Sequence, residues 1–158
     1  MLAAALTMAE FALLRVGEFT CPSSTEYDPD TTMLVSDIEL AGWPAAAGTA
    51  DTARMIVNVK ASKVDVFRKG VKITCHSTGG TVDVVRLMQE YLEERGTQDL
   101  FAPLFVRQDG KYLTRSNVDA ALKAGLQACG WDASKHSTQS LRSGGGQCPW
   151  LQRGTGAK

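Results

Sequence analysis

The sequence predicts a mostly α-helical domain that contains a small three-stranded antiparallel β-sheet. Apolar residues recur with helical spacing near both ends of the chain, and three short β-like runs lie between residues 33 and 75. The chain has 158 residues, which is enough for one sizeable core, and its apolar fraction of 44% is ordinary for a globular protein.

The first element is expected to be one buried helix over residues 2–19, because this stretch is apolar on almost every face. Its start resembles the apolar part of a signal segment, but it lacks a basic region, and Glu10 and Arg15 interrupt it. No stretch approaches the ~20 apolar residues that a bilayer span needs. We therefore predict no membrane partner.

Strands are predicted over residues 33–40, 54–60 and 70–75, and the polar turn over 61–69 suggests a hairpin. The next pattern is helical and ends at Gly96, in the position where glycine commonly terminates a helix. The residues on its apolar face are Val84, Val85, Met88, Tyr91 and Leu92. Tyr91 is therefore expected in the core.

Another helix is expected to begin at Ser116, with Asp119 completing a capping box, and to close at Gly130. A last helix should begin near Ser137 or Thr138. The periodicity then collapses after Ser143. We predict one domain over residues 1–145 and an irregular, disordered tail over 146–158.

Composition excludes several classes of function. A net charge of 0 argues against a sequence-blind DNA coat, because phosphate affinity scales with the number of cations presented. The 4 cysteines are scattered, which indicates neither a disulfide framework nor a zinc site and favours a reducing, intracellular location. No metal site, cofactor or small-molecule substrate is predicted.

Three polar segments stand out. Arg15 and Glu18 lie three residues apart at the end of the first helix, where a surface ion pair is the simplest interpretation. The stretch 54–72 holds six cations against one acid, Asp65, and a basic β-turn can lie along phosphates. Arg142 falls in the first turn of the last predicted helix, where free backbone N–H groups favour a phosphate.

In this order and spacing, the three segments resemble the phage-integrase-type tyrosine recombinases, and among them the eukaryotic mobile-element branch. The matching signatures are L-R-x-x-E at residues 14–18, S-K-x-D-x-F-R-x-G-V at 62–71 and L-R-S-G-G at 141–145. Pro103-Leu-Phe, Asp109-Gly and Leu113-Thr-Arg also match, so the resemblance spans about residues 9–145. It implies the DNA breaking–rejoining (integrase-like) catalytic core, incomplete here.

The resemblance implies a role for each matched residue. Arg15 and Arg142 correspond to two arginines that clamp the reacting phosphate, whose growing charge needs permanently protonated donors. Lys63 corresponds to the hairpin lysine that protonates the departing 5′ oxygen. Further contacts with DNA are expected from four cations: Lys60, Arg68, Lys69 and Lys135.

Two departures from the family pattern affect the predicted activity. Gln139 occupies the position of a histidine, and glutamine cannot carry a proton in acid–base catalysis. The family continues to a tyrosine nucleophile, whereas Tyr27, Tyr91 and Tyr112 all precede Arg142. We therefore expect a homologue that does not complete strand exchange alone.

The expected partners are DNA and other recombinase protomers, and the expected location is intracellular, in the nucleus if the source is a eukaryote. Two alternatives remain: a non-catalytic module that binds DNA or a partner recombinase, and a relic of a mobile element without function. An unrelated small enzyme is disfavoured, because the sequence shows no paired carboxylates, metal-ligand spacing or nucleophile–base arrangement.

Overall fold

The computed structural model describes residues 1–41, 53–60 and 70–138. Within them lie four α-helices and one three-stranded sheet, so the predicted combination of helices with a small antiparallel sheet is confirmed. The helices are α1 (Leu2–Phe11), α2 (Val16–Phe19), α3 (Val84–Arg95) and α4 (Arg115–Ala128). The strands are β1 (Ile38–Ala41), β2 (Arg54–Val59) and β3 (Val71–His76), and two 3-10 turns are η1 (Val35–Asp37) and η3 (Ala133–Lys135).

The sheet has the order β1-β2-β3 with both pairs antiparallel, and Met55 at its centre lies opposite Leu40 and Cys75. Alternate residues of β2 are buried, because successive side chains of a strand point to opposite faces. The buried ones are Met55, Val57 and Val59. This face contributes the sheet's part of the core.

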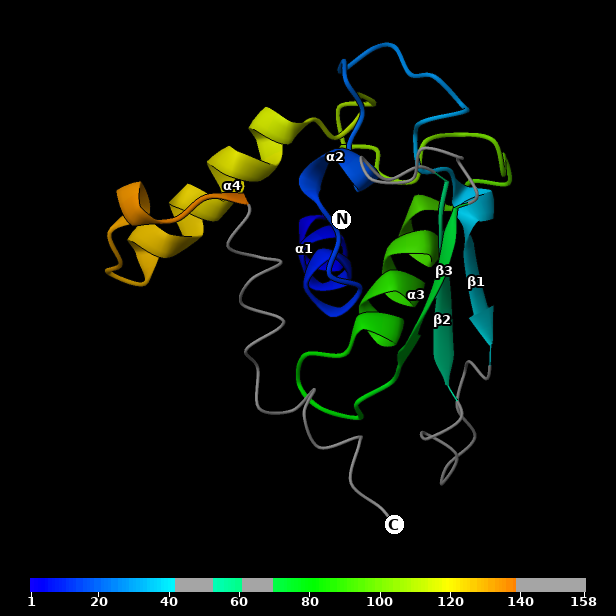
Figure 1. The fold of residues 1–158 in the computed structure, drawn as a ribbon, viewed down its shortest axis with the longest axis horizontal. Coiled ribbons are helices and arrows are strands. Elements are labelled where there is room, and N and C mark those ends of the chain that lie inside the picture. The colour runs from blue at the N-terminus through cyan, green and yellow to red at the C-terminus, as the bar shows by residue number, and fades with distance from the viewer. Residues whose placement is uncertain (42–52, 61–69, 139–158) are drawn as a thin grey trace.

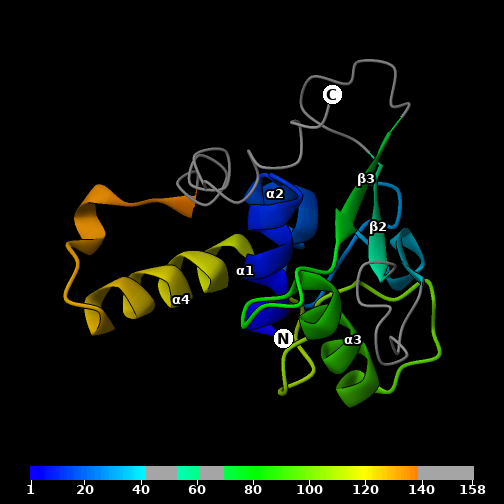
Figure 2. The same ribbon diagram turned by 90° about the horizontal axis from the view of Figure 1, so that it is seen from below.

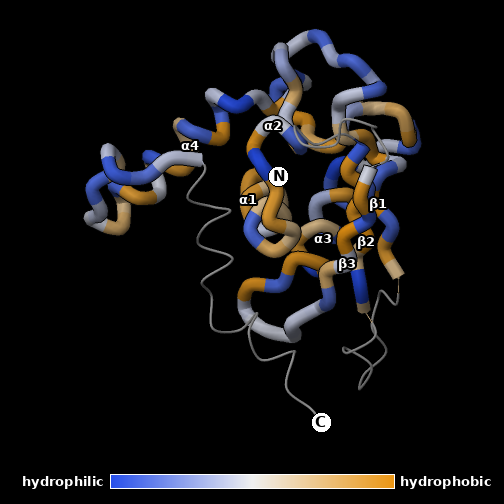
Figure 3. The backbone as a smooth tube through the Cα atoms, in the orientation of Figure 1, coloured by the Kyte–Doolittle hydropathy of each residue, from blue (hydrophilic) through white to orange (hydrophobic). Residues whose placement is uncertain are grey.

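The elements form successive layers, with the sheet, α3 and α1 side by side and α4 projecting away beyond α1 (Figures 1 and 2). Hydrophobic residues gather along α1 and the neighbouring strands (Figure 3). The buried face of α1 consists mainly of small residues, which let its backbone approach α3 closely: Ala4, Ala5, Met8 and Ala9. None of the helices in the described part of the chain is long and apolar enough to cross a membrane.

The predicted single helix over residues 2–19 is wrong in its length. α1 ends at Phe11, and the separate short helix α2 begins at Val16. The break is centred on Leu13, whose φ of 53° lies in the left-handed region. The sequence contains no glycine between residues 2 and 16 to signal this end.

The predicted strand over residues 33–40 is half right. Only Ile38–Ala41 joins the sheet, whereas the preceding residues bind a different part of the chain. Leu34 pairs with Pro103 as an isolated bridge, and the Val35 N–H donates to the carbonyl of Ala102. An alternating pattern shows that a segment is extended, but it does not identify the partner.

The predicted ends of α3 and α4 lie within two residues of the observed ones, whereas the helix predicted to begin near Ser137 or Thr138 continues into residues outside the described ranges. α3 is capped at its C-terminus by Gly96 in the left-handed conformation, as predicted. α4 is capped by Thr114 rather than Ser116. The Asn117 Oδ1 accepts from the Thr114 backbone N–H at 3.1 Å and from its hydroxyl at 2.7 Å. The capping pair is therefore shifted by two residues from the predicted one.

The carboxylate of Asp83 joins the end of β3 to the start of α3. Its Oδ1 accepts from the N–H groups of Val85 and Arg86, and its Oδ2 accepts from the Ser77 hydroxyl and from the N–H groups of Thr78 and Gly79. Burial alone would raise the pKa of this carboxyl, but these hydrogen bonds outweigh it and hold the pKa below its ordinary value.

We predict that Asp83→Asn lowers the free energy of unfolding at neutral pH by about 2–3 kcal/mol. Asparagine still caps α3, but its amide nitrogen would face three donors that now share Oδ2. Because the folded pKa is depressed, the contribution of Asp83 is present above the ordinary carboxyl pKa of about 4 and is lost as the pH falls through the lower folded value. The difference between the two proteins, measured by urea denaturation, should therefore shrink in acid.

Asp99→Asn is the matched control for this measurement. The Asp99 carboxylate accepts from one exposed backbone N–H, that of Phe101 at 2.9 Å. Its replacement should cost less than about 1 kcal/mol. Equal losses for the two variants would contradict the role given to Asp83.

Candidate functional site

Arg15 occupies the N-cap of α2, in extended backbone with φ −78° and ψ 146°. Its backbone N–H donates to Glu18 Oε2 at 2.7 Å, and its Nη1 lies 3.4 Å from Glu18 Oε1. A guanidinium group has no hydrogen-bond acceptor, so the Arg15 side chain cannot accept from a backbone N–H of α2. The Glu18 carboxylate therefore makes the cap hydrogen bond alone. The predicted Arg15–Glu18 ion pair is present, but it lies at the start of a short helix rather than at the end of a long one.

The Arg15 guanidinium group is held and still accessible. Its side chain is 42% exposed, whereas that of Glu18 is 11% exposed. Glu18 contacts only one of the five guanidinium N–H donors through Nη1, which leaves a fork that matches two oxygens of a phosphate. The arrangement can therefore bind an anion without a rearrangement of the backbone.

α2 is fixed to the core and to the start of α4. Phe19 meets Phe105 edge to face, with ring centroids 6.2 Å apart. The Cys21 N–H donates to the Leu113 carbonyl at 2.8 Å, next to the Thr114 cap of α4. Arg15 is thus presented from a rigid element, which a phosphate contact requires for a defined position.

Arg115 is a cation that the sequence reasoning did not select. It is exposed at the first position of α4 and makes no ion pair with the part of the chain that the structure describes. With Gly17 of α2 it lines an open hollow of about 780 Å³, whose other walls include Thr20, Cys21 and Thr32. The sequence signal for Arg115 is its position directly after a threonine that can cap a helix, because the N-terminus of a helix favours an anion.

Lys60, predicted to contact DNA, is engaged within the fold. Its ammonium group donates to the carbonyls of Pro29 at 2.8 Å and Thr32 at 3.2 Å, and it pairs with Asp37 at 3.0 Å. These three contacts account for all three N–H donors of a lysine. Lys60 therefore ties the end of β2 to the 28–37 loop.

Lys135 lies at the other side of the molecule from the sheet, in η3 beyond α4 (Figure 1). Its ammonium group is 3.5 Å from Asp132, and its side chain is largely exposed. His136 packs on Trp131, with ring centroids 5.7 Å apart. Lys135 is accessible to a phosphate, but it stands apart from Arg15.

The remaining predicted site residues lie outside the described residues: Lys63, Arg68, Lys69, Gln139 and Arg142. The same holds for the predicted domain end at residue 145 and for the tail over 146–158. Their described neighbours can be located. Lys60 follows β2 and Gly70 precedes β3, so these two residues flank the segment 61–69. Residues 136–138 turn back from η3 toward α2 (Figures 1 and 2).

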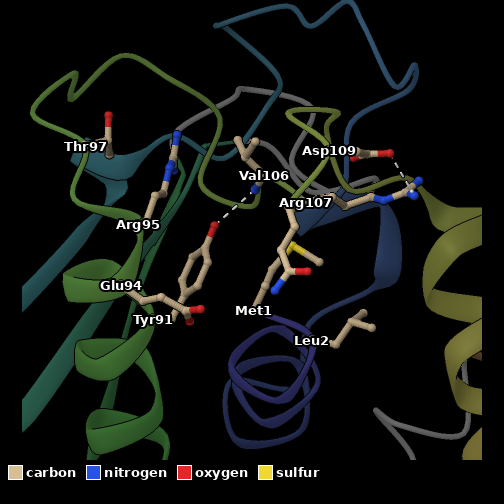
Figure 4. Close-up of a pocket in the computed structure, with 10 residues that line it drawn as sticks. Met1, Leu2, Tyr91, Glu94, Arg95, Thr97, Val106, Arg107 and Asp109 are labelled. Carbon is tan, nitrogen blue, oxygen red and sulfur yellow. Dashed lines mark hydrogen bonds and ion pairs between the residues drawn. The ribbon is translucent and has the colours of Figure 1, made fainter.

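Tyr91 is part of the core, as predicted. Its hydroxyl group donates to the Leu104 carbonyl at 3.0 Å and accepts from the Val106 N–H at 3.0 Å. Burial raises its pKa, which disfavours the phenolate. Figure 4 shows Tyr91 at the wall of an open pocket of about 760 Å³, beside Arg95, which donates to the Pro103 and Leu104 carbonyls.

The other tyrosines are also held by neighbours. Tyr27 and Tyr112 meet edge to face at 5.4 Å, and the Tyr27 hydroxyl donates to the Phe101 carbonyl at 3.2 Å. Burial raises the pKa of the Cys21 and Cys75 thiols to about 11, so neither is a ready nucleophile at neutral pH. Among the described residues, no three His, Cys, Asp or Glu side chains gather as a metal site requires.

No protein-family model and no curated protein matches this chain.

We predict that Lys60→Met lowers the free energy of unfolding by about 1–3 kcal/mol, because two carbonyls and the buried Asp37 carboxylate lose their donor. Thermal or urea denaturation measures the loss. Lys72→Met is the control, since Lys72 pairs with Glu39 at 3.4 Å between two exposed side chains and should contribute less than about 1 kcal/mol. A Lys60→Met protein as stable as the parent would return Lys60 to the candidates for DNA contact.

Proposed function

We propose that this chain is a DNA-binding domain of the tyrosine-recombinase type, which holds the phosphate backbone and does not cut DNA by itself. The observation that carries the proposal is the accessible Arg15 guanidinium group, held by Glu18 in the first of three segments whose order and spacing resemble that family. A fixed arginine fork beside an open surface is suited to a phosphate.

The arrangement of the described residues supports a common binding face. Arg15 and Arg115 are presented from α2 and from the start of α4, which are joined through Cys21 and Leu113. Residues 136–138, which precede Arg142 in the chain, turn back from η3 toward α2 (Figures 1 and 2). The proposal adds Arg142 and Lys63 to this face, so that four cations from distant segments would act on one stretch of DNA backbone.

The proposed chemistry stops at binding. Arg15 and Arg142 would clamp a phosphate, and Lys63 would be the proton donor to a leaving 5′ oxygen. In-line attack needs a nucleophilic oxygen at the phosphate, and the effective molarity is lost without one. The Tyr91 hydroxyl is committed to Leu104 and Val106, and no tyrosine follows Arg142 in these 158 residues.

A module that docks on a partner recombinase is a second candidate, which α4 favours. Val118, Leu122 and Leu126 recur with helical spacing along α4, and only Val118 is buried. α4 projects from the body (Figure 2), and Leu122 and Leu126 are only partly buried, so they leave an apolar stripe partly open. A protein partner that covers this stripe would be expected to increase the affinity for DNA.

The DNA-binding proposal predicts salt-sensitive binding, with log K falling linearly with log salt concentration. Arg15→Ala should weaken binding by about 1–3 kcal/mol and reduce the slope by about 1, because one charge-assisted phosphate contact is lost. Fluorescence anisotropy with a labelled duplex measures both quantities. Arg86→Ala is the control, since Arg86 pairs with Glu90 and donates to the Thr81 carbonyl. Equal effects of the two substitutions would contradict the assignment of Arg15.

The proposal also predicts no covalent intermediate. On a nicked suicide duplex, the chain alone should form no protein–DNA adduct that survives denaturation. The assay is repeated with an intact recombinase, which in this family can donate its tyrosine helix to a neighbour. An adduct formed by the chain alone would overturn the proposal, and Tyr→Phe variants at positions 27, 91 and 112 would then identify the nucleophile.

A further inference from the structure

The residue that ends α1 adopts a conformation that its side chain disfavours. Leu13 has φ 53°, and it is the only non-glycine residue with positive φ in the described ranges. In this region the Cβ atom crowds the following carbonyl, so glycine is the usual occupant. The Leu13 side chain is 39% exposed, so burial gives little reason for a leucine here.

The hydrogen bonds around Leu13 form a complete helix stop. The Leu13 N–H donates to the Glu10 carbonyl at 3.3 Å, and the Leu14 N–H donates to the Ala9 carbonyl at 2.9 Å. These are the two bonds of a Schellman motif, in which the residue with positive φ follows the helix cap. Leu14 and Ala9 are both buried in the hydrophobic core, at the two positions where a Schellman motif is commonly accompanied by an apolar contact.

This stop frees the backbone of Arg15 for Glu18. In a continuous helix the Arg15 N–H would donate to the carbonyl four residues earlier, that of Phe11. Because α1 ends at Phe11 and the chain reverses at Leu13, the Arg15 N–H donates to the Glu18 carboxylate instead, at 2.7 Å. The same carboxylate contacts the guanidinium group, so one side chain holds both ends of Arg15.

We propose that Leu13 is a positioning residue for Arg15: its left-handed backbone turns the chain out of α1 and sets the guanidinium group where Glu18 can hold it toward a phosphate. This inference rests on the proposed function for the identity of the ligand. The dependence of the Arg15–Glu18 contact on the conformation of Leu13 does not require DNA and can be tested without it.

Two substitutions at Leu13 separate conformation from side-chain chemistry. Leu13→Gly accepts positive φ without crowding, so it should raise the melting temperature and leave the affinity for DNA within about twofold. Leu13→Val resists positive φ because of its branched Cβ, so it should weaken DNA binding about tenfold, as Arg15→Ala does, and lower the salt slope by about 1. A loss of stability alone would not change the slope of a protein that is still folded.

A double substitution tests whether Leu13 acts through Arg15. In the Arg15→Ala background, Leu13→Val should cause no further loss of affinity, because the group that it positions is absent. Additive losses in the double variant would overturn the proposal. An unchanged affinity and salt slope in folded Leu13→Val would also overturn it.

Hydrogen exchange of the Arg15 amide tests the same point without DNA. The amide should be protected in the parent protein and in Leu13→Gly, and it should exchange faster in Leu13→Val and in Glu18→Gln. If Leu13→Val does not fold, Leu13→Gly is compared with the parent protein, and the glycine, which relieves the crowding at Cβ, should protect the amide at least as well. A faster-exchanging Arg15 amide in Leu13→Gly would contradict the inference. If the parent protein binds no DNA while these exchange differences hold, the proposed function fails and the positioning role survives.

Discussion

The burial of α1 against the core is the constraint on which the candidate site depends. Its alanine-rich face packs against α3, which in turn covers the sheet, so a charge on that face would be withdrawn from solvent. A chain that must present Arg15 has to leave this environment abruptly. The reversal at Leu13 achieves that within one residue, and α2 then returns Val16 and Phe19 to the core.

Polar side chains join the layers at the points where strands and helices end. Asp83 receives five hydrogen bonds between β3 and α3, and Lys60 makes three contacts between β2 and the 28–37 loop. Both charges are largely withdrawn from solvent and compensated, which is the condition under which buried ionic groups are tolerated. Residues 54–72 contain six cations, but one of them, Lys60, is bound within the fold. Fewer cations are therefore available to a partner than the sequence of this segment indicates.

The electrostatics of the accessible surface differ from those of the whole chain. The net charge is 0, yet Arg15 and Arg115 stand open near the junction of α2 with α4. A neutral protein with a local cationic face gains less from nonspecific attraction to DNA than a basic one, so its binding depends more on the geometry of individual arginines. This dependence makes the conformation of a single residue such as Leu13 relevant to function.

The sequence by itself determined the type and order of the three strands, α3 and α4, because hydrophobic periodicity is a local property that each segment carries alone. It also identified the end of α3 at Gly96, the burial of Tyr91 and the pairing of Arg15 with Glu18, which are contacts within one element or residue types with strong preferences. Only the tertiary structure decided where α1 ends, which residues pair with Leu34 and what Lys60 binds. Each of these depends on atoms brought close by folding: a buried Leu14 that stabilises a strained neighbour, a bridge to Pro103, and two loop carbonyls far from Lys60 in sequence. No local pattern encodes such contacts, because their free energy exists only once the layers have packed.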